Sequence, residues 1–589
     1  MSGAAPPFSG EPPSPAERLD SWKEVAAYLK RSVRTVRRWE VEQGLPVHRH
    51  LHQSSGTVYA FKGELDRWWA SRVAELEATT EEERVEPVAP SPRRWRHRTT
   101  WLIGAAVAGV AVLIFPWGGR FGAHTTPSRV MLAVLPLDNL SGQPTQDYFS
   151  DGLTEEIITN LGRLNPQRLG VIARTSVLRY RHAKAGIDEI GRELHVDYVL
   201  EGSIRSQQDR VRVTAQLVRV SDQTHVWADS YDSTSQDVLG LQADVAEAVS
   251  RAIEIALTPE AETELRVTTS NRDAYEAYLM GRYFWNNRTS GTLKQALQYF
   301  ERATQIDPKY AEAYAGLANC YVMLPIYTDM ADRDAEPKAE AAATKALQLD
   351  PSLGEVFATL AIVRWSRWEW AEAESNLRHA IELRPNYVTA YQWYADYLQQ
   401  VGRLREAAAQ IDKAKELDPI SVLTNSYAAF QLYLERRYDE AIAQSNKVVE
   451  MEPRRTDFRN RLGLAFMAKG MFKEAADQFG KTRELDPDDP APIGWLGTAY
   501  AMSGQRQEAR KLLQELDGFV RRGRPRSGFY AALVHIALGE TDLGFDLLNQ
   551  SVDEHIGEIG WLKTGPMFDN LRADPRYELL LKRMNFPTD

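Results

Sequence analysis

Residues 354–387 read GEVFATLAIVRWSRWEWAEAESNLRHAIELRPNY, and a stretch of similar pattern recurs through the second half of the chain. Prolines at intervals of 34 residues mark the period. They are Pro351, Pro385, Pro419, Pro453 and Pro487. Each proline closes a phrase such as QLDP, ELRP or KELDP, where it would end a helix and turn the chain into the next unit. A period of this length is typical of an all-α solenoid built from helix–turn–helix units.

Small residues occupy fixed places in this period, where the two helices of a unit must approach each other. They are Ala361 and Ala373, Ala395 and Ala407, Ala429 and Ala441, Gly463 and Ala475, and Gly497 and Ala509. Large apolar residues such as Leu377, Ile411 and Phe479 follow at the next turn of the second helix. The pattern closely resembles tetratricopeptide (TPR) repeats. We place about eight of them in residues 275–558, followed by a C-terminal cap over residues 559–589.

The resemblance to TPR repeats implies a concave surface that binds a protein or a peptide. A purely structural spacer is the alternative. Four tryptophans of the array could line the concave face, although we expect most of them to pack in the core: Trp365, Trp368, Trp370 and Trp393. Cys320, the only cysteine, also falls in the array, where we expect a small buried packing residue.

A second compact unit is predicted near the N-terminus, over residues 17–72, after a proline-rich tail (1–16) that we expect to be disordered. Ser21 and Glu24 have the spacing of a capping box at the start of a short helix. The pattern then predicts a second helix over 33–43, a β-hairpin within 47–61 and a last helix over 64–72. This order of elements is that of a winged helix-turn-helix.

Basic residues gather on the second helix of this unit, although the whole chain has a formal net charge of −10. Arg34, Thr35, Arg37 and Arg38 lie on the face opposite to the apolar face around Val36. A helix of this kind can enter a major groove while the hairpin meets phosphate. DNA is therefore the predicted partner, and a small protein-interaction fold with a basic face is the alternative.

The stretch TVRRWE at 35–40, followed by GLP at 44–46, resembles the recognition helix and turn of MerR-type and excisionase-type heads. The resemblance implies that Thr35, Arg37 and Arg38 contact DNA, and we include Arg34 of the same helix face. The hairpin departs from that family, because residues 53–55 are Gln-Ser-Ser where basic residues would be expected. This departure weakens the expected contact of the hairpin with phosphate.

A row of histidines alternates along the first strand of the predicted hairpin: His48, His50 and His52. Their side chains would point the same way, and such a row can bind Zn²⁺ or Ni²⁺. Since no orienting carboxylate is evident nearby, we expect ordinary polar residues and assign no metal or other cofactor. Whether the row binds metal stays an open question at this point.

An uncharged apolar stretch, WLIGAAVAGVAVLIFPW, follows a linker over residues 73–98. With Thr99 and Thr100 it extends over residues 99–117, a length that approaches the hydrocarbon thickness of a bilayer. We therefore predict a single transmembrane helix. Arginines at 93–98 precede this helix, which by the positive-inside rule predicts an inner-membrane protein with a cytoplasmic N-terminus and periplasmic C-terminal domains.

Strand and helix patterns alternate over residues 130–258 and predict an α/β domain. The motifs VLPL at 134–137, YFSDGL at 148–153 and DYVLEG at 197–202 resemble the TolB-N-terminal/FlgO-like domain. That resemblance implies a binding or assembly domain. Asp151, Glu155 and Glu156 could suggest catalysis or metal binding, but we expect them in the first turn of a helix, where the macrodipole favours acids.

The chain shows no Gly-rich phosphate loop of the GxxxxGK[ST] type, no HExxH motif and no GxSxG elbow, so we predict that it is not an enzyme. The order of the parts resembles ToxR/CadC-type one-component transcription regulators. This resemblance implies a DNA-binding head and outer domains that sense a signal or bind a partner. Because one head has a small footprint, we expect tight DNA binding to need two heads on paired half-sites, as in a homodimer. The alternatives are a TPR envelope scaffold and a regulatory subunit of a signalling enzyme, each with a head that does not bind DNA. The operator, the stimulus and the sign of regulation cannot be predicted from the sequence.

Overall fold

The computed structural model describes residues 18–19, 21–29, 36, 39–40, 45–49, 58–66, 68–69, 129–141, 147–181, 185–207, 210–234, 238–255, 271–287, 289–328 and 330–587. The chain divides into two compact units, Met1–Phe121 and Gly122–Asp589. The predicted tail (1–16) and linker (73–98) lie outside the described residues.

The first unit contains helix α1 (Trp22–Tyr28) and a three-stranded antiparallel sheet in the order β1-β3-β2. The strands are β1 (Arg18–Leu19), β2 (His48–Arg49) and β3 (Val58–Phe61). The prediction that Ser21 caps the first helix is confirmed, because its side chain accepts a hydrogen bond from the Glu24 amide at 3.2 Å. The antiparallel pairing of the two hairpin strands is confirmed as well, with His48 opposite Tyr59. The predicted turn between them lies outside the described residues, and β1 was not predicted. Val25, Val36 and Leu65 are fully buried in the core of this unit.

The second unit begins with a sheet in the order β6-β4-β7-β8-β9. Its strands are β4 (Val130–Val134), β6 (Leu169–Val171), β7 (Tyr198–Gln207), β8 (Arg210–Arg219) and β9 (His225–Thr234), with the short β5 (Asp138–Asn139) beside β7. The central β4 is parallel to β6 and β7, and the last three strands are antiparallel. The order of strands and helices is as predicted, but β9 continues well past Trp227, where the predicted strand ends.

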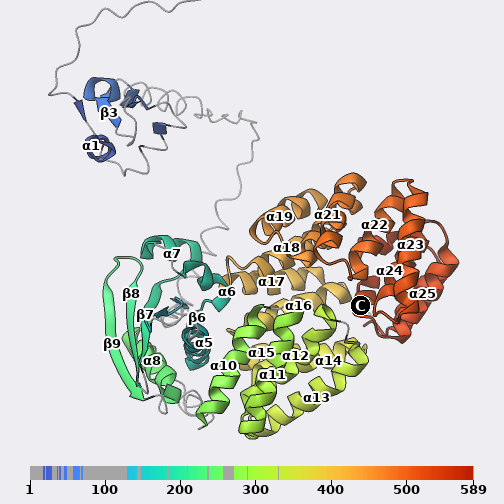
Figure 1. Ribbon diagram of the computed structural model, residues 1–589, viewed down its shortest axis with the longest axis horizontal. Helices are drawn as coiled ribbons and strands as arrows, with labels where there is room; N and C mark the ends of the chain where they lie inside the picture. The colour runs from blue at the N-terminus through green and yellow to red at the C-terminus, as the bar shows by residue number, and fades with distance from the viewer. Residues whose placement is uncertain are drawn as a thin grey trace, which may run out of the picture. The chain divides into compact units, whose positions relative to one another are not determined.

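Within the described residues, four α-helices belong to this sheet domain: α5 (Asp147–Leu164), α6 (Arg174–Val177), α7 (Ile187–Leu194) and α8 (Val238–Ala252). Leucine and isoleucine side chains of α5 and valines of α8 share one apolar core with alternate residues of β8, such as Val213 and Leu217. On the opposite face, Ile190 and Leu194 of α7 pack with Ala133 and Val199. Figure 1 shows the resulting layers, with β9 on the side of the sheet away from the helical array.

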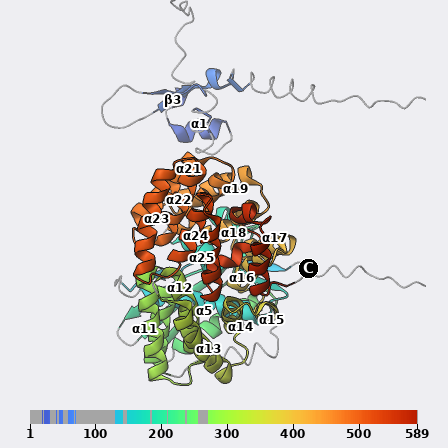
Figure 2. The ribbon, with the colours of Figure 1, turned by 90° about the vertical axis from the view of Figure 1, so that its right-hand side faces the viewer.

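A helical solenoid follows the sheet domain (Figures 1 and 2). Within the described residues its helices form the successive pairs α10 (Arg272–Asn287) and α11 (Ser290–Ile306), α12 (Ala311–Tyr327) and α13 (Asp332–Leu349), α14 (Gly354–Ser366) and α15 (Trp370–Leu383), α16 (Val388–Val401) and α17 (Leu404–Leu417), α18 (Val422–Leu434) and α19 (Tyr438–Met451), α20 (Thr456–Ala468) and α21 (Phe472–Leu485), α22 (Pro490–Met502) and α23 (Arg506–Arg521), and α24 (Ser527–Ala537) and α25 (Thr541–Asp553). Two short 3₁₀ helices and a last α-helix end the chain: η4 (Gly557–Leu562), η5 (Pro566–Leu571) and α26 (Pro575–Arg583).

The small residues of the period lie where predicted, buried between the two helices of each pair. Gly463 illustrates the requirement, since a Cβ atom there would lie 2.4 Å from the Phe479 ring. From the pair α14–α15 onward, the turn between the two helices places one residue per repeat in the left-handed region of φ. Glycine fills this position at Gly402, Gly470 and Gly504, but the equivalent residues Trp368 and Arg436 adopt φ of 61°. Such a conformation is unfavourable for a side chain larger than glycine.

The end of the chain, residues 555–587, returns to the middle of the array (Figures 1 and 2). This C-terminal segment stacks Phe586 on Trp370, with ring centroids 4.7 Å apart, and places Trp561 edge-on against Phe430 at 4.8 Å. The Trp370 indole N–H donates to the Met584 carbonyl at 2.8 Å. The four tryptophans that could have lined the concave face are all buried: Trp365, Trp368, Trp370 and Trp393. The expectation that most of them pack in the core is therefore confirmed.

The predicted fold class requires a correction. Among the residues that the structure describes, none of the helices is both long and apolar enough to cross a membrane. The described fold is largely a TPR-like helical solenoid with a small sheet domain, and the predicted span at 99–117 lies outside the described ranges. The predicted single-pass location in the inner membrane, with periplasmic C-terminal domains, depended on this helix and is corrected with it.

Candidate functional site

The sheet domain and the repeat array meet through charged side chains of α5 and α10. Glu155 of α5 forms an ion pair with Arg282 of α10 and accepts a hydrogen bond from Asn286 at 2.8 Å. Burial disfavours the charged form of Glu155, but Arg282 and Arg174 outweigh it and hold the pKa of this carboxyl below its usual value. Asp151, one turn earlier, pairs with Arg174 at 3.2 Å and with Arg181.

The expected reason for these acids was wrong. Because α5 begins at Asp147, residues Asp151, Glu155 and Glu156 lie beyond its first turn, where the helix dipole has little effect. Their charges are compensated instead by arginines from α6 and α10. Glu155 and Glu156 therefore belong to an interface between two domains, whereas Asp151 is compensated within the sheet domain.

Two repeat turns of the array, residues 384–388 and 417–421, complete this interface. At the first turn, the Asn386 side-chain amide donates to the carbonyls of Gly162 at 2.9 Å and Leu169 at 3.1 Å. Its oxygen accepts from the Val171 amide at 3.4 Å and from Arg129. Asn386 thus covers the edge of the sheet at β6.

At the second turn, Asp418 accepts hydrogen bonds from the hydroxyls of Thr175 and Ser176, each at 2.7 Å. The adjacent backbone takes part as well, since the Ala173 amide donates to the Leu417 carbonyl at 2.8 Å. Burial raises the pKa of Asp418, although these hydroxyls act in the opposite direction. Nothing in the local sequence signals this role, because Asp350 occupies the same place in the period.

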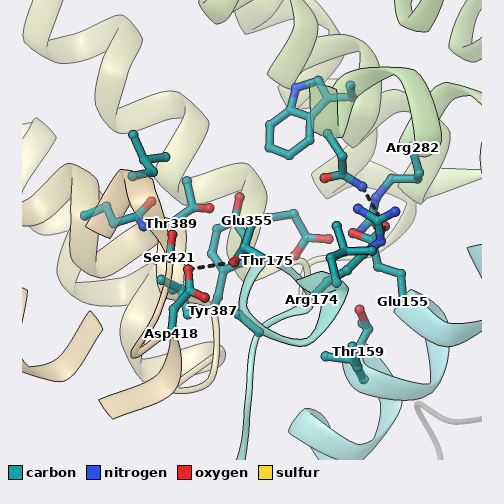
Figure 3. A pocket seen from close by; sticks show the side chains of 18 of the residues that line it. Glu155, Thr159, Arg174, Thr175, Arg282, Glu355, Tyr387, Thr389, Asp418 and Ser421 are labelled. Carbon is teal, nitrogen blue, oxygen red and sulfur yellow. Dashed lines mark hydrogen bonds and ion pairs between the residues drawn. The ribbon is translucent and has the colours of Figure 1, made fainter. Parts of the chain in front are cut away.

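A cavity of about 880 Å³ lies between these contacts (Figure 3). Its walls come from α5 and the loop into α6 on one side, and from helices α10, α12, α16, α18 and α20 with their turns on the other. Polar and aromatic side chains predominate in the lining, including Trp285, Asn319, Tyr387, Thr389 and Gln392. Such a partly enclosed space with convergent polar groups is typical of a binding site.

Ionisable groups at one end of the cavity are deeply buried. Glu355 and Arg384 form an ion pair there, and the second terminal nitrogen of Arg384 has no hydrogen-bond partner among the described residues. Burial raises the pKa of Glu312 to about 7, with Glu156 acting in the same direction and Arg163 against it. This end of the cavity therefore holds a buried donor without a hydrogen-bond partner and a carboxyl group that titrates near neutrality. Both groups could form hydrogen bonds with a polar ligand.

The residues predicted to contact DNA, Arg34, Thr35, Arg37 and Arg38, lie outside the described residues, as do His50 and His52. His48 is described and lies 2.8 Å from Glu64, so this histidine does have a carboxylate partner. In the described ranges no three His, Cys, Asp or Glu side chains are grouped so as to hold a metal ion. Cys320 is buried, and burial raises the pKa of its thiol, as suits a packing residue.

Comparison with known proteins gives the class to which the parts of this chain belong. Residues 128–248 match the family described as HilA/YgeH-like transcriptional regulator, second domain. Residues 288–324, 428–490 and 466–522 match tetratricopeptide repeats. The chain therefore carries TPR repeats and a HilA-like regulator domain. The resemblance of the sheet domain to TolB-N-terminal/FlgO-like domains stays a prediction.

Two curated relatives are similar to parts of the chain. Putative adenylate cyclase 3 of Rhizobium meliloti (strain 1021) is 37% identical over 194 residues, which are 33% of this chain and 32% of that protein. Transcriptional regulator HilA of Salmonella typhimurium is 24% identical over 282 residues, 48% of this chain and 49% of that protein. This chain thus spans a third to a half of the length of these relatives. Among solved structures, YrrB, a TPR protein with an unusual peptide-binding site, is 20% identical with a TM-score of 0.23, over 33% of this chain and 95% of YrrB.

Proposed function

We propose that this protein is a transcription regulator that binds DNA through its N-terminal head and a regulatory ligand through the second unit. The observation that carries the proposal is the HilA-like domain, bound to a TPR array around a polar cavity. Regulators of this kind need a site for DNA and a separate site whose occupancy biases the first. The cavity offers the second site, and the ligand would be a small polar molecule or a short peptide.

The core of the N-terminal head agrees with the proposed DNA-binding site. Val36 is fully buried, in agreement with the apolar face predicted for the second helix. In the proposal, Arg34, Thr35, Arg37 and Arg38 occupy the opposite face and reach base edges and phosphates. An arginine that reads guanine contributes about 1–3 kcal/mol of discrimination.

The test is a selection of genomic fragments that bind the full-length protein, followed by affinity measurements on the best fragment. Arg37→Ala and Arg38→Ala should each weaken binding about tenfold or more. Lys23→Ala is the matched control, because Lys23 is an exposed cation of α1 outside the predicted recognition helix. If no fragment binds at low salt, or if all three variants behave alike, the DNA-binding proposal fails.

A second function is favoured by one observation, the similarity to a protein named a putative adenylate cyclase. In this alternative, the HilA-like domain and the repeats regulate a separate signalling enzyme, and the head contacts protein instead of DNA. We propose no catalytic activity for the chain in either case. Absence of DNA binding together with capture of the second unit by a cyclase would favour this alternative.

A further inference from the structure

The two edges of the sheet in the second unit are in different situations. The β6 edge is covered, because Asn386 bonds the β6 backbone and Leu417 bonds Ala173 just beyond it. The other edge is β9, a strand of 10 residues with β8 as its partner on the inner side. In the part of the chain that the structure describes, no strand pairs with the outer side of β9. A long uncovered edge is a template for another strand.

The direction of the β9 backbone groups can be read from one hydrogen bond. The Ser230 amide donates to the Asp229 carboxylate at 2.8 Å, a contact within β9 itself. This N–H is therefore directed to the open edge, since an amide directed inward would bond β8. Backbone groups alternate between the two sides of an antiparallel strand, so Ala228 and Asp232 share the orientation of Ser230. In antiparallel pairing with a further strand, Ser230 would exchange backbone hydrogen bonds with it.

The side chains of β9 are suited to partial burial on one face. Trp227 and Tyr231 are half-buried, lie on the face covered by α8, and have ring centroids 6.4 Å apart. The opposite face carries Ala228, Ser230 and Asp232, all exposed. Aromatic residues at the rim of a core are common anchors of protein interfaces, because they exclude water over a large area.

We infer that β9 pairs antiparallel with β9 of a second copy of this chain, which joins the two sheets into one across a two-fold axis. In such an antiparallel pair, the side chains of two opposite residues lie on the same face of the joined sheet. The two-fold axis must therefore pass midway between one residue and the same residue of the second copy. The registers that pair most of the strand place the axis at Asp229 or at Ser230. The first sets Asp229 against Asp229 of the second copy, and like charges directly opposite are destabilising. The second sets Asp229 against Tyr231 and Asp232 against Ala228, so Ser230 lies on the axis.

This register makes a specific test possible with engineered cysteines, because Cys320 is buried. In Ser230→Cys the Cα atoms of the two cysteines would lie about 5.5 Å apart in a hydrogen-bonded pair, so both thiols are within reach of a short thiol-bridging reagent such as dibromobimane. In the matched control Ala228→Cys the two thiols would be offset by about 13 Å along the strand. The reagent should therefore cross-link the full-length protein as a dimer in the Ser230→Cys variant and not in the Ala228→Cys variant.

A second variant tests the pairing without a cross-link. Ser230→Pro removes an amide that faces the open edge and an exposed hydroxyl contact with Thr214 of β8, while the backbone ladder with β8 is kept. Sedimentation velocity on the full-length protein should show a dimer for the natural sequence and a monomer of unchanged circular dichroism for Ser230→Pro. A monomeric natural protein at all concentrations, a dimeric Ser230→Pro variant, or equal cross-linking of both cysteine variants would each overturn the inference. These measurements use no DNA, so their outcome is separate from that of the DNA-binding test.

Discussion

Two parts of the chain lie against the repeat array, and they are held by different chemistry. The sheet domain is held by polar groups: Asp418 with two hydroxyls, Asn386 with backbone carbonyls, and Arg282 with Glu155. The C-terminal segment is held mainly by aromatic rings, with Phe586 on Trp370 and Trp561 against Phe430. The cavity lies at the polar interface and not at the aromatic one.

The difference indicates which interface can respond to a ligand. Burial of apolar surface stabilises without demanding one exact geometry, and it leaves no group in need of a new partner. Buried polar groups stabilise an interface only while each has a partner, and removal of one partner is unfavourable. A polar ligand in the cavity competes for such partners. We therefore expect the sheet domain to be the adjustable part and the C-terminal segment to be part of the core.

The largest effect is expected at the aromatic interface, from Trp370→Ala. This substitution removes a buried side chain that stacks on Phe586 and leaves the Met584 carbonyl without its donor. Large-to-small changes of buried tryptophan lower the free energy of unfolding by about 3–5 kcal/mol. Urea unfolding followed by circular dichroism measures this change in the free energy of unfolding. Leu579→Ala in the C-terminal segment is the control, since Leu579 is 58% exposed, and an equal loss of stability in both variants would contradict the assignment.

A smaller and more local effect is expected at the polar interface, from Asp418→Ala. The hydroxyls of Thr175 and Ser176 lose a charged acceptor, which weakens docking of the sheet domain by about 2–3 kcal/mol. Hydrogen exchange should accelerate over residues 169–181 while the helices after α20 keep their protection.

Asp350→Ala is the matched control for that experiment, because Asp350 has the same place in the period but bonds only its own turn, at Ser352. If Asp350→Ala accelerates exchange over residues 169–181 to the same extent, the specific role of Asp418 is wrong.

The smallest effect concerns pH. The pKa of Glu312 is raised from 4.5 to about 7, so the folded protein holds this proton more tightly than the unfolded chain does. The resulting stabilisation is fully present below pH 4.5 and is lost as the pH rises through about 7. Between about pH 6 and about pH 8 one such group should change the free energy of unfolding by about 1 kcal/mol.

The polar interface and the aromatic interface should also differ in the residue that makes each of them sensitive to pH. Asp332, near Glu558 of the C-terminal segment, also has a pKa raised to about 7 by burial and by Glu558. Amide exchange itself accelerates with pH, so the quantity to compare is protection relative to the rates of an unfolded chain. Glu312→Gln should remove the pH dependence of this protection in the sheet domain, and Asp332→Asn should remove it in the C-terminal segment. The interpretation fails if each variant affects both regions equally.

Much of the array could be predicted because its signals are local. A proline two residues after the second helix of the pairs up to α21, as at Pro385 after Leu383, and small residues at helix contacts recur with the period. Strand alternation likewise indicated β7 and β8. Contacts between distant segments could not be predicted: Asp418 and Asp350 stand in the same LDP phrase, yet only Asp418 meets the sheet domain.

The left-handed turns show the same limit. Gly402 is the residue that such a turn favours, whereas Trp368 and Arg436 hold this conformation beside the C-terminal segment. Trp368 stacks on His555 at 5.5 Å, and Arg436 bonds Asp569 at 2.8 Å. Their local sequence gives no reason for a positive φ. For the head, the predicted DNA contacts lie outside the described residues, so this part of the site stays a prediction.

The hydrogen bond from Trp370 to Met584 joins residues 214 positions apart. A ribosome that adds about 5–20 residues per second needs about 10–40 s to travel from one to the other. During most of that interval the aromatic surface around Trp370 has left the exit tunnel but is not yet covered. A nascent chain stalled between these two positions would present that surface to chaperones and proteases.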